Sequence, residues 1–357
     1  ARDLLACVDV AMILSNCKIV AQDTPSNLVK NINAKNAYFG ESFKINWYLM
    51  SNSIIIKKKI KKFNKIISVS GDKSLSIRWV LISSLASGVS SAKNLLISED
   101  VLAAINAVKK LGIKVSYNKF SCKIYGKGID GYKYNNKLTI NAENSGTLAR
   151  LILGLIINSP HAVKLIGDKS LSKRDFKRVT EPLSKFGAVF KFQKKNGLPL
   201  IMKGSKNLTP IKYFEKKGSA QCKSSVMFAG IRTPGKTVIK AKKSRNHTEL
   251  LFKYLNLPIK IKNNKKYDLI EVKKVEKIKP LNYIVPSDIS SAAFFIVLTI
   301  LSKNSKITIK GVNINPSRIG VITILKKMGI NVVFKNKKIY KGEQIADICV
   351  TSSRKIS

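Results

Sequence analysis

The octapeptide Gly71-Asp72-Lys73-Ser74-Leu75-Ser76-Ile77-Arg78 combines a glycine, two hydroxyls and two cations, directly after the β-rich run 66–70. A strand that ends in a glycine turn and opens a helix directs backbone N–H groups and the positive end of the helix toward one point. Lys73 adds a compact charge to this turn, and Arg78 adds a planar fork of donors. The stretch predicts a strand–turn–helix corner that binds a phosphate or a carboxylate. A capped helix start with solvated charges is the alternative.

The spacing of the octapeptide differs from that of a Walker A loop, which needs Gly-x-x-x-x-Gly-Lys-Ser/Thr. Similar groupings of hydroxyls and cations recur at three later helix starts, namely Asn144–Arg150, Gly167–Arg174 and Ser219–Ser224. Each one alone is compatible with ordinary helix capping. Together, the four predict helix N-termini that converge on a polyanionic ligand.

A helix followed by a short turn and a β-rich segment occurs four times. The turns fall at residues 112, 187, 257 and 329, at intervals of roughly 70–75 residues. This regularity predicts one α/β unit used at least four times. Several such units are expected to close into each globular domain.

The chain is strongly basic. Its 357 residues include 66 Lys and Arg against 20 Asp and Glu, which gives a formal net charge of +46. This excess first indicates nucleic-acid binding. However, the lysines are spread along the whole chain, and the sequence has no zinc-finger spacing, no RNP-type motif and no compact basic arm. Small anionic substrates fit the charge as well, so a nucleic-acid-binding protein is kept as the alternative from another functional class.

Cysteine and histidine usage argues against a metal centre. The five cysteines are scattered without a Cys-x-x-Cys pair, and the histidines are His161 and His247. We interpret His247 as part of a helix-capping cluster and Cys222 as a buried thiol. The longest apolar runs, 151–157 and 292–301, are too short to cross a bilayer. We therefore expect a cytoplasmic protein that does not contact membranes.

Seven segments together resemble the 5-enolpyruvylshikimate-3-phosphate synthase family, in its order and spacing, over residues 54–357. They are Gly71–Arg78, Asn144–Arg150, Gly167–Arg174, Ser219–Ser224, Arg245–Glu249, Pro286–Phe294 and Asn315–Gly320. The resemblance implies an α/β (α+β) fold of two domains, each built from repeated βαβαββ units. The expected divisions are a join with the first strand at 47–65, a first domain of three units at 66–284, and an incomplete second domain at 285–357.

The resemblance also implies transfer of enolpyruvyl from phosphoenolpyruvate to the 5-hydroxyl of shikimate 3-phosphate, a step of the shikimate pathway toward chorismate and the aromatic amino acids. By motif, the catalytic candidate is Lys73, which contacts both substrates. The candidates for shikimate 3-phosphate are Lys73, Ser74, Arg78, Ser219, Ala220, Gln221 and Arg245. Those for phosphoenolpyruvate are Lys73, Gly146, Arg174 and Gln221. Neither a metal nor an organic cofactor is expected, and the full-length protein is expected to be a monomer.

This sequence departs from the family pattern at three turns. Asp175 stands where Pro is usual, Asn246 where Asp commonly precedes the His, and Ser287 where Gly is usual. Residue 146 is Gly, whereas glyphosate-tolerant members carry Ala, so we hypothesise that glyphosate fits this site. The family's catalytic Asp, a Lys–Glu pair and further phosphoenolpyruvate-binding cations belong to a part beyond the segments matched here. The polypeptide is therefore expected to be an inactive fragment.

Two further resemblances complete the sequence-based picture. UDP-N-acetylglucosamine enolpyruvyltransferase shares the implied fold and is the alternative enzyme, but it uses a cysteine on a mobile loop that no segment here matches. Residues 1–46 resemble the C-terminal tail of the ATPase subunit of the lipopolysaccharide-export ABC transporter, through the segments 9–13, 18–20, 24–25 and 37–43. We interpret the chain as two neighbouring genes read as one, with the enzyme starting near Met50.

Overall fold

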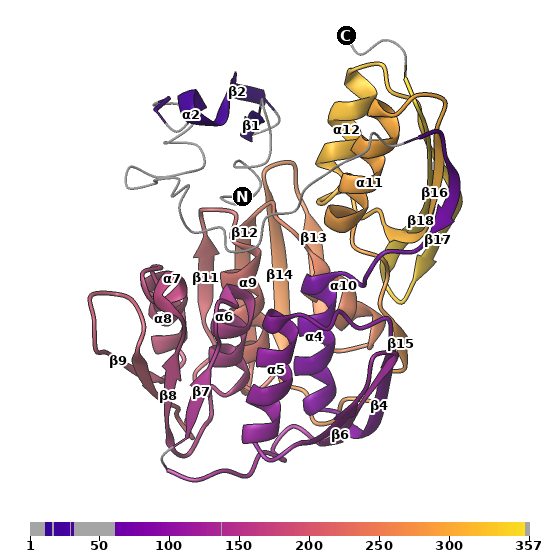
Figure 1. The fold of residues 1–357 in the computed structure, drawn as a ribbon. Coiled ribbons are helices and arrows are strands. Elements are labelled where there is room, and N and C mark those ends of the chain that lie inside the picture. The colour runs from indigo at the N-terminus through magenta and orange to yellow at the C-terminus, as the bar shows by residue number, and fades with distance from the viewer. Residues whose placement is uncertain (1–10, 16–17, 29, 32–60, 137, 354–357) are drawn as a thin grey trace.

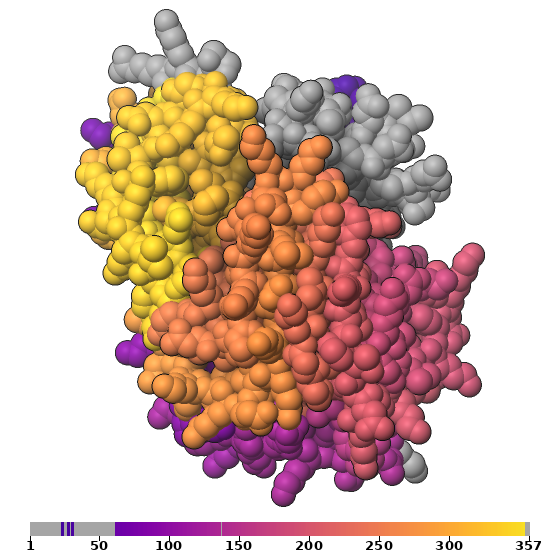
Figure 2. Space-filling view, turned by 180° about the vertical axis from the view of Figure 1, so that it is seen from behind, coloured from indigo at the N-terminus to yellow at the C-terminus, as the bar shows by residue number. Residues whose placement is uncertain are grey.

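The structure is a computed structural model that describes residues 11–15, 18–28, 30–31, 61–136 and 138–353 (Figure 1). Two lobes dominate these residues. The first lobe spans residues 73–284, and the second lobe consists of residues 61–67 and 288–353. Each lobe has its own hydrophobic core, so the lobes are separate packing units. Figure 2 shows the second lobe, in yellow, packed beside the orange part of the first.

Within the described residues, four four-stranded sheets share one arrangement. An edge strand pairs in parallel with its neighbour, and the remaining two pairings are antiparallel. The first sheet of the first lobe has the strand order β15 (Tyr283–Ile284), β4 (Ser87–Lys93), β6 (Ser121–Lys127) and β5 (Lys114–Tyr117). The second has the order β7 (Thr139–Asn141), β8 (Ala162–Ile166), β10 (Leu200–Lys203) and β9 (Val189–Phe192). The third has the order β11 (Lys212–Glu215), β12 (Lys236–Lys242), β14 (Tyr267–Lys273) and β13 (Ile259–Asn263). The sheet of the second lobe is β17 (Val332–Tyr340), β18 (Glu343–Thr351), β16 (Lys306–Asn313) and β3 (Asn64–Ile67).

The helices connect these strands into βαβαββ units. The helices of the first lobe are α4 (Lys73–Ser84), α5 (Glu99–Lys110), α6 (Gly146–Leu155), α7 (Lys169–Ser172), α8 (Lys177–Ser184), α9 (Ala220–Gly230) and α10 (His247–Tyr254). Those of the second lobe are α11 (Ile289–Leu301) and α12 (Gly320–Lys327). Near the N-terminus, β1 (Ala11–Ser15) and β2 (Lys18–Asp23) form a hairpin that is followed by α2 (Pro25–Leu28). The mixed α/β fold and its repeated unit are thus confirmed.

The predicted helix–turn–strand repeats are present at all four positions. Gly112, Gly187 and Gly329 turn the chain with positive φ values of 86°, 109° and 75°, a conformation that glycine adopts without steric cost. At the third turn the left-handed residue is Asn256, with φ of 53°, one position before the predicted residue 257. Asparagine tolerates this region better than most residues with a side chain.

The two lobes exchange strands. β15, which follows all three units of the first lobe in sequence, pairs in parallel with β4 and completes the sheet of the first unit. β3, which precedes the first lobe, pairs in parallel with β16 and completes the sheet of the second lobe. The sequence-based boundary at residue 66 therefore falls inside β3, a strand of the second lobe. The chain crosses between the lobes twice, at residues 68–72 and 285–288, and we call this pair of segments the double crossing.

The central helices of the first lobe are buried on nearly all sides. Every residue of α4 from Leu75 to Ser84 is buried, as are most of α6 and α9, which pack on each other. A helix that is apolar around its whole circumference belongs inside a core, between sheets rather than on a surface. The N-terminal turns of these helices are therefore held rigidly, and they carry most of the candidate site residues.

In contrast, α11 of the second lobe leaves an apolar face in solvent. Phe294 is 62% exposed and Leu301 is 69% exposed. Adjacent exposed apolar side chains of this size mark a surface that favours association. None of the helices in the described part of the chain is both long and apolar enough to span a membrane.

Candidate active site at the helix N-termini

The corner predicted from the octapeptide is a strand–turn–helix corner at the start of α4. Asp72 caps the helix, because its Oδ1 accepts from the Leu75 amide at 2.9 Å. The backbone N–H of Lys73 donates to Oδ2 of Asp288, a residue of the second lobe, at 3.2 Å. The expectation that these N–H groups are open to a ligand is thus wrong for Lys73 and Leu75. Any anion at this corner depends on the side chains.

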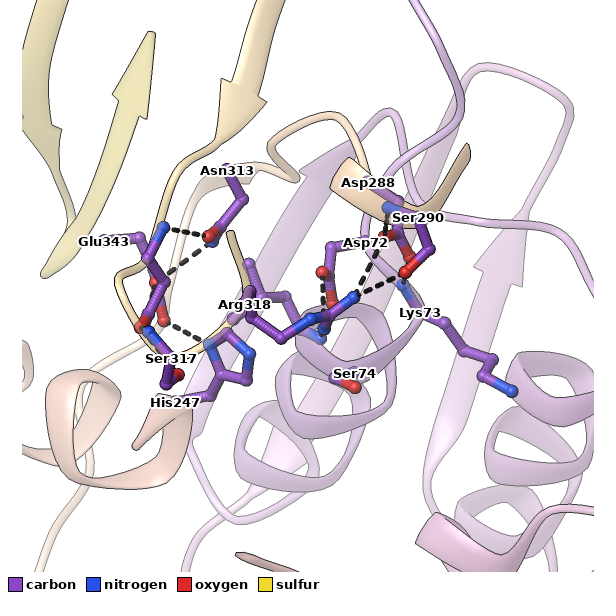
Figure 3. Close-up of polar contacts among 12 residues, drawn as sticks. Asp72, Lys73, Ser74, His247, Asp288, Ser290, Asn313, Ser317, Arg318 and Glu343 are labelled. Carbon is purple, nitrogen blue, oxygen red and sulfur yellow. Dashed lines mark hydrogen bonds and ion pairs between the residues drawn. The ribbon is translucent and has the colours of Figure 1, made fainter. Parts of the chain in front are cut away.

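Lys73 and Ser74 offer such side chains. Lys73 is exposed, and its Nζ lies 3.2 Å from Oδ2 of Asp100, in the first turn of α5. Ser74 is partly exposed on the adjacent position of α4. Figure 3 shows the Lys73 side chain extending away from the carboxylates that hold its backbone. An exposed ammonium with one half-buried partner can exchange that partner for a substrate anion at small cost.

Arg78 lies beneath this corner. Its Nε donates to Oγ1 of Thr248 at 2.8 Å, and its two terminal nitrogens donate to the Ser74 carbonyl at 3.0 Å and Oγ of Ser224 at 3.2 Å. Burial lowers the pKa of Arg78 to about 10, although the charge of Glu249 opposes the shift. The guanidinium is therefore still charged at neutral pH, and it fixes the backbone of Ser74 from within the lobe.

Gln221 and Arg150 connect the starts of α6 and α9. Arg150 donates to Oε1 of Gln221 at 2.9 Å and to the Gly146 carbonyl at 3.1 Å. Gln221 in turn donates through Nε2 to Oγ1 of Thr147 at 3.0 Å. The Gln221 amide thus accepts one hydrogen bond and donates another to residues of α6, and these two bonds tie the start of α9 to that of α6.

Two guanidinium groups converge on Gly146, the first residue of α6. A Cβ at this position would lie 2.9 Å from a terminal nitrogen of both Arg150 and Arg174. Arg174 is exposed and also donates to Oδ1 of Asn144 at 3.2 Å. Burial lowers the pKa of Arg150, and the positive charge of Arg174 lowers it further. Two like charges held this close favour an anion between them.

The remaining candidates lie at the starts of α9 and α10. Ser219 caps α9, since its Oγ accepts from the Cys222 amide at 3.2 Å, and Ala220 is the first residue of that helix. Arg245 is exposed and just precedes α10. Burial raises the pKa of Cys222, in agreement with the interpretation of a buried thiol.

The candidate residues thus come from neighbouring helix ends. Arg78 joins α4 to both α9 and α10, and the Arg150–Gln221 contact joins α6 to α9. The N-terminal turns of α4, α6, α9 and α10 therefore lie next to one another. Three of these are among the four predicted helix starts, whereas α10 is not. The fourth predicted segment, Gly167–Arg174, reaches the group through Arg174, which follows the end of α7 and donates to Asn144. Within the described residues, no group of three or more His, Cys, Asp or Glu side chains is placed to hold a metal ion.

Sequence reasoning missed several participants. Asp100 and Asp288 carry no local signal of their partners, whereas Arg150 and Arg318 lay in the matched segments without an assigned role. The cluster interpreted as a helix cap does lie at a helix start, since α10 begins within it at His247, but the His247 side chain does not cap the helix. Its ring is fully buried, and Nδ1 lies 2.7 Å from Oε1 of Glu343 in β18, while Asn246 occupies the N-cap position. The reason is tertiary, since Glu343 is 96 residues away in sequence.

Comparisons with known proteins agree with this geometry. The family model described as EPSP synthase (3-phosphoshikimate 1-carboxyvinyltransferase) matches residues 57–352. A 3-phosphoshikimate 1-carboxyvinyltransferase of Thermoanaerobacter sp. (strain X514) is 40% identical over 301 residues, which cover 84% of this chain and 70% of the relative. The protein of that name from Sulfurihydrogenibium sp. (strain YO3AOP1) is 41% identical over 296 residues, covering 82% and 68%.

Solved structures give the same result. EPSP synthase from Acinetobacter baumannii superimposes with a TM-score of 0.76 at 33% identity, and the alignment covers 83% of this chain and 66% of that one. The chain therefore spans about two thirds of the length of the proteins it matches.

The comparisons do not support the transporter resemblance of residues 1–46. The family model begins at residue 57, beyond that segment, and residues 1–10, 16–17, 29 and 32–46 lie outside the described part of the chain. From residue 57 onward, by contrast, the family model, the curated relatives and the solved structures all match the same part of the chain. This chain belongs to the EPSP synthase family.

Proposed function

We propose that this chain binds shikimate 3-phosphate at the starts of α4, α9 and α10, and takes part in the transfer of enolpyruvyl from phosphoenolpyruvate to the 5-hydroxyl of that substrate. The observations that carry the proposal are the convergence of Arg150 and Arg174 on Gly146 and the exposed ammonium of Lys73 at the start of α4. This arrangement provides two cationic positions, one for each anionic substrate.

The chemistry of the reaction requires such an arrangement. Both substrates carry a phosphate and a carboxylate, so that four anionic groups must be held close together. Charge-assisted hydrogen bonds from forked and point cations offset their repulsion and stabilise the charge that develops during transfer. Lys73, at the start of α4, is the candidate that contacts both substrates. Ser74, Arg78, Ser219, Ala220, Gln221 and Arg245 are proposed for shikimate 3-phosphate, and Gly146, Arg174 and Gln221 for phosphoenolpyruvate.

The remaining properties belong to the same proposal. A shikimate-pathway enzyme acts on small metabolites, so we propose a cytoplasmic location, a monomeric state for the full-length protein, and no nucleic-acid partner. The net charge of +46 is then a general property of the surface rather than a binding site.

Calorimetric titration of the full chain with shikimate 3-phosphate tests the site. Lys73→Ala is expected to raise the Kd at least tenfold, because the exposed ammonium is a direct ligand. The matched control is Lys236→Ala, which removes the same charge from an exposed pair with Glu271 elsewhere in the first lobe. This control is expected to change the Kd less than twofold.

Two results would count against the proposal. Equal weakening by Lys73→Ala and Lys236→Ala would mean that only the general surface charge attracts the ligand. Failure of the folded chain to bind shikimate 3-phosphate, together with tight duplex DNA binding that falls steeply with salt, would favour the nucleic-acid alternative.

A further inference from the structure

The double crossing is the point where the two lobes are joined covalently and by hydrogen bonds. The Asp72 amide donates to the Pro286 carbonyl at 2.8 Å, and the Asp288 amide donates to the Ser70 carbonyl at 2.9 Å. The two segments thus lie side by side, and each leads directly into a helix. Asp72 precedes α4 of the first lobe, and Asp288 precedes α11 of the second lobe.

Both of these capping carboxylates bind one arginine. Arg318, which precedes α12 of the second lobe, donates from one terminal nitrogen to Oδ2 of Asp72 at 3.1 Å. Its other terminal nitrogen donates to Oδ1 of Asp288 at 3.1 Å and to Oγ of Ser290 at 2.9 Å. Figure 3 shows Arg318 reaching Asp72, Asp288 and Ser290. The Arg318 side chain is only 6% exposed. A buried fork therefore bridges the N-caps of two helices in different lobes.

This bridge continues to the candidate site. Oδ2 of Asp288 accepts from the backbone N–H of Lys73 at 3.2 Å. Arg318 therefore holds the carboxylate that holds the first residue of α4, whose side chain is the proposed ligand of both substrates.

Charge gives Arg318 a second effect on the same corner. Asp72 and Asp288 place two carboxylates at the helix end that is proposed to receive an anionic substrate. Arg318 pairs with both, and Arg245 lies close enough to interact electrostatically with Arg318 and with the two carboxylates. Without Arg318, a net negative charge at this corner would repel a phosphate or carboxylate ligand.

We infer that Arg318 is a positioning residue for the anion site of α4, which aligns Lys73 through Asp288 and neutralises the two carboxylates that cap the joined helices. The inference rests on the proposed function only for the identity of the anion. Arginine suits this role because its planar fork reaches two carboxylates at once, whereas the ammonium of lysine is a point charge.

The test compares Arg318→Gln with Lys310→Gln in the full chain. Both variants remove one positive charge from the second lobe. Arg318→Gln breaks the buried pairs with Asp72 and Asp288, whereas Lys310→Gln breaks one pair, with Asp347 at 2.8 Å, in which the Lys310 side chain is 47% exposed. The first measurement is amide hydrogen exchange in segment 71–78, with segment 146–155 of α6 as the internal reference. The second is calorimetric titration with shikimate 3-phosphate.

Arg318→Gln is expected to speed exchange in segment 71–78 several-fold, to leave segment 146–155 unchanged, and to raise the Kd at least tenfold. Lys310→Gln is expected to change neither. The inference is overturned if Arg318→Gln behaves like Lys310→Gln in both measurements. Should Arg318→Gln fail to fold, Arg318→Lys serves in its place, because it keeps the charge but cannot bridge both carboxylates; unchanged exchange and Kd in that variant would equally overturn the inference.

The design separates the two proposals. If the wild-type chain does not bind shikimate 3-phosphate but Arg318→Gln still speeds exchange in segment 71–78, the proposed function fails and the positioning role of Arg318 is supported. If the wild-type chain binds shikimate 3-phosphate and Arg318→Gln leaves both exchange and binding unchanged, the proposed function is supported and the positioning role of Arg318 fails.

Discussion

At the residue scale, two glycines occupy positions where a side chain would meet a neighbour at close range. Gly71 lies in the double crossing, where a Cβ would fall 2.0 Å from the carbonyl oxygen of Asn94 and 2.9 Å from a methyl group of Val285. Gly146 faces the mobile ends of two arginine side chains instead. Substitution therefore affects the backbone at the first position and the ligand site at the second.

Gly71→Ala is expected to lower the free energy of unfolding by roughly 1–3 kcal/mol, the usual cost of overpacking. The backbone carbonyl of Asn94 cannot move aside without disturbing the crossing. Gly320→Ala is the control, because nothing lies within 4 Å of a Cβ at this first residue of α12. Alanine there should be neutral or slightly stabilising. Urea unfolding of both variants checks the prediction, and equal stabilities would contradict it.

Gly146→Ala is expected to leave the stability nearly unchanged, because the ends of Arg150 and Arg174 can move. It should nevertheless weaken the binding of a small anion between them. We therefore expect glyphosate, titrated in the presence of shikimate 3-phosphate, to bind the wild-type chain at least tenfold more tightly than Gly146→Ala. Binding of shikimate 3-phosphate alone should change little. Glyphosate binding of equal strength in the two proteins would refute the hypothesis that it fits beside Gly146.

At the scale of helices and strands, a buried ion pair joins two helices that carry the site. Nζ of Lys223 in α9 lies 2.5 Å from Oε1 of Glu249 in α10, and both side chains are almost fully buried. The negative charge of Glu249 also raises the pKa of Arg78 in α4 and so favours the charged guanidinium. The pair thus belongs to the polar contacts that align the three helix starts.

Glu249→Gln is expected to destabilise the chain by about 3–5 kcal/mol, because it leaves the buried ammonium of Lys223 without its counter-charge. The double variant Lys223→Met/Glu249→Gln should recover a large part of that loss. Lys236→Gln, which breaks an exposed pair, should cost less than about 1 kcal/mol. Urea unfolding of the three variants is the measurement, and a Glu249→Gln variant as stable as Lys236→Gln would contradict the prediction.

At the scale of the whole molecule, the buried contact between His247 and Glu343 connects the two lobes. Oε2 of Glu343 also accepts from Asn313 at 3.0 Å and from Asn315 at 3.1 Å. Burial by itself raises the pKa of Glu343, but the hydrogen bonds from His247, Asn313 and Asn315 outweigh it and lower the pKa below its usual value of 4.5. The charged carboxylate is therefore favoured by the folded contact between lobes.

This shift makes the lobe contact sensitive to acid. A carboxylate whose pKa is depressed by folding contributes stability that is fully present above its unfolded pKa and is lost as the pH falls through its folded pKa. The stability difference between the wild-type chain and Glu343→Gln should be constant above about pH 5 and shrink below pH 4.5. Thermal melts of both proteins between pH 7 and pH 3 measure this difference. A difference independent of pH over that range would rule out the role of the charged carboxylate.

Features that depend on residues close together in sequence could be predicted, and features that depend on distant residues could not. Helix caps such as Asp72, turns such as Gly112 and Gly187, and cations in the first helical turn depend on residues within a few positions of one another. The sequence therefore determined the repeated α/β unit and the position of the cationic helix starts. It also determined the family, because several such short patterns recur in a fixed order and spacing.

Only the tertiary structure decided how the units share strands and which charges meet. Arg318 reaches Asp72 across 246 residues of sequence, and Lys73 reaches Asp288 across 215. No local pattern marks such partners, because a lysine, an aspartate or a histidine has the same neighbours in sequence whether it is solvated or buried against the other lobe. The exchange of β3 and β15 between lobes has the same cause: a strand's pattern specifies its buried face but not the sheet that it joins.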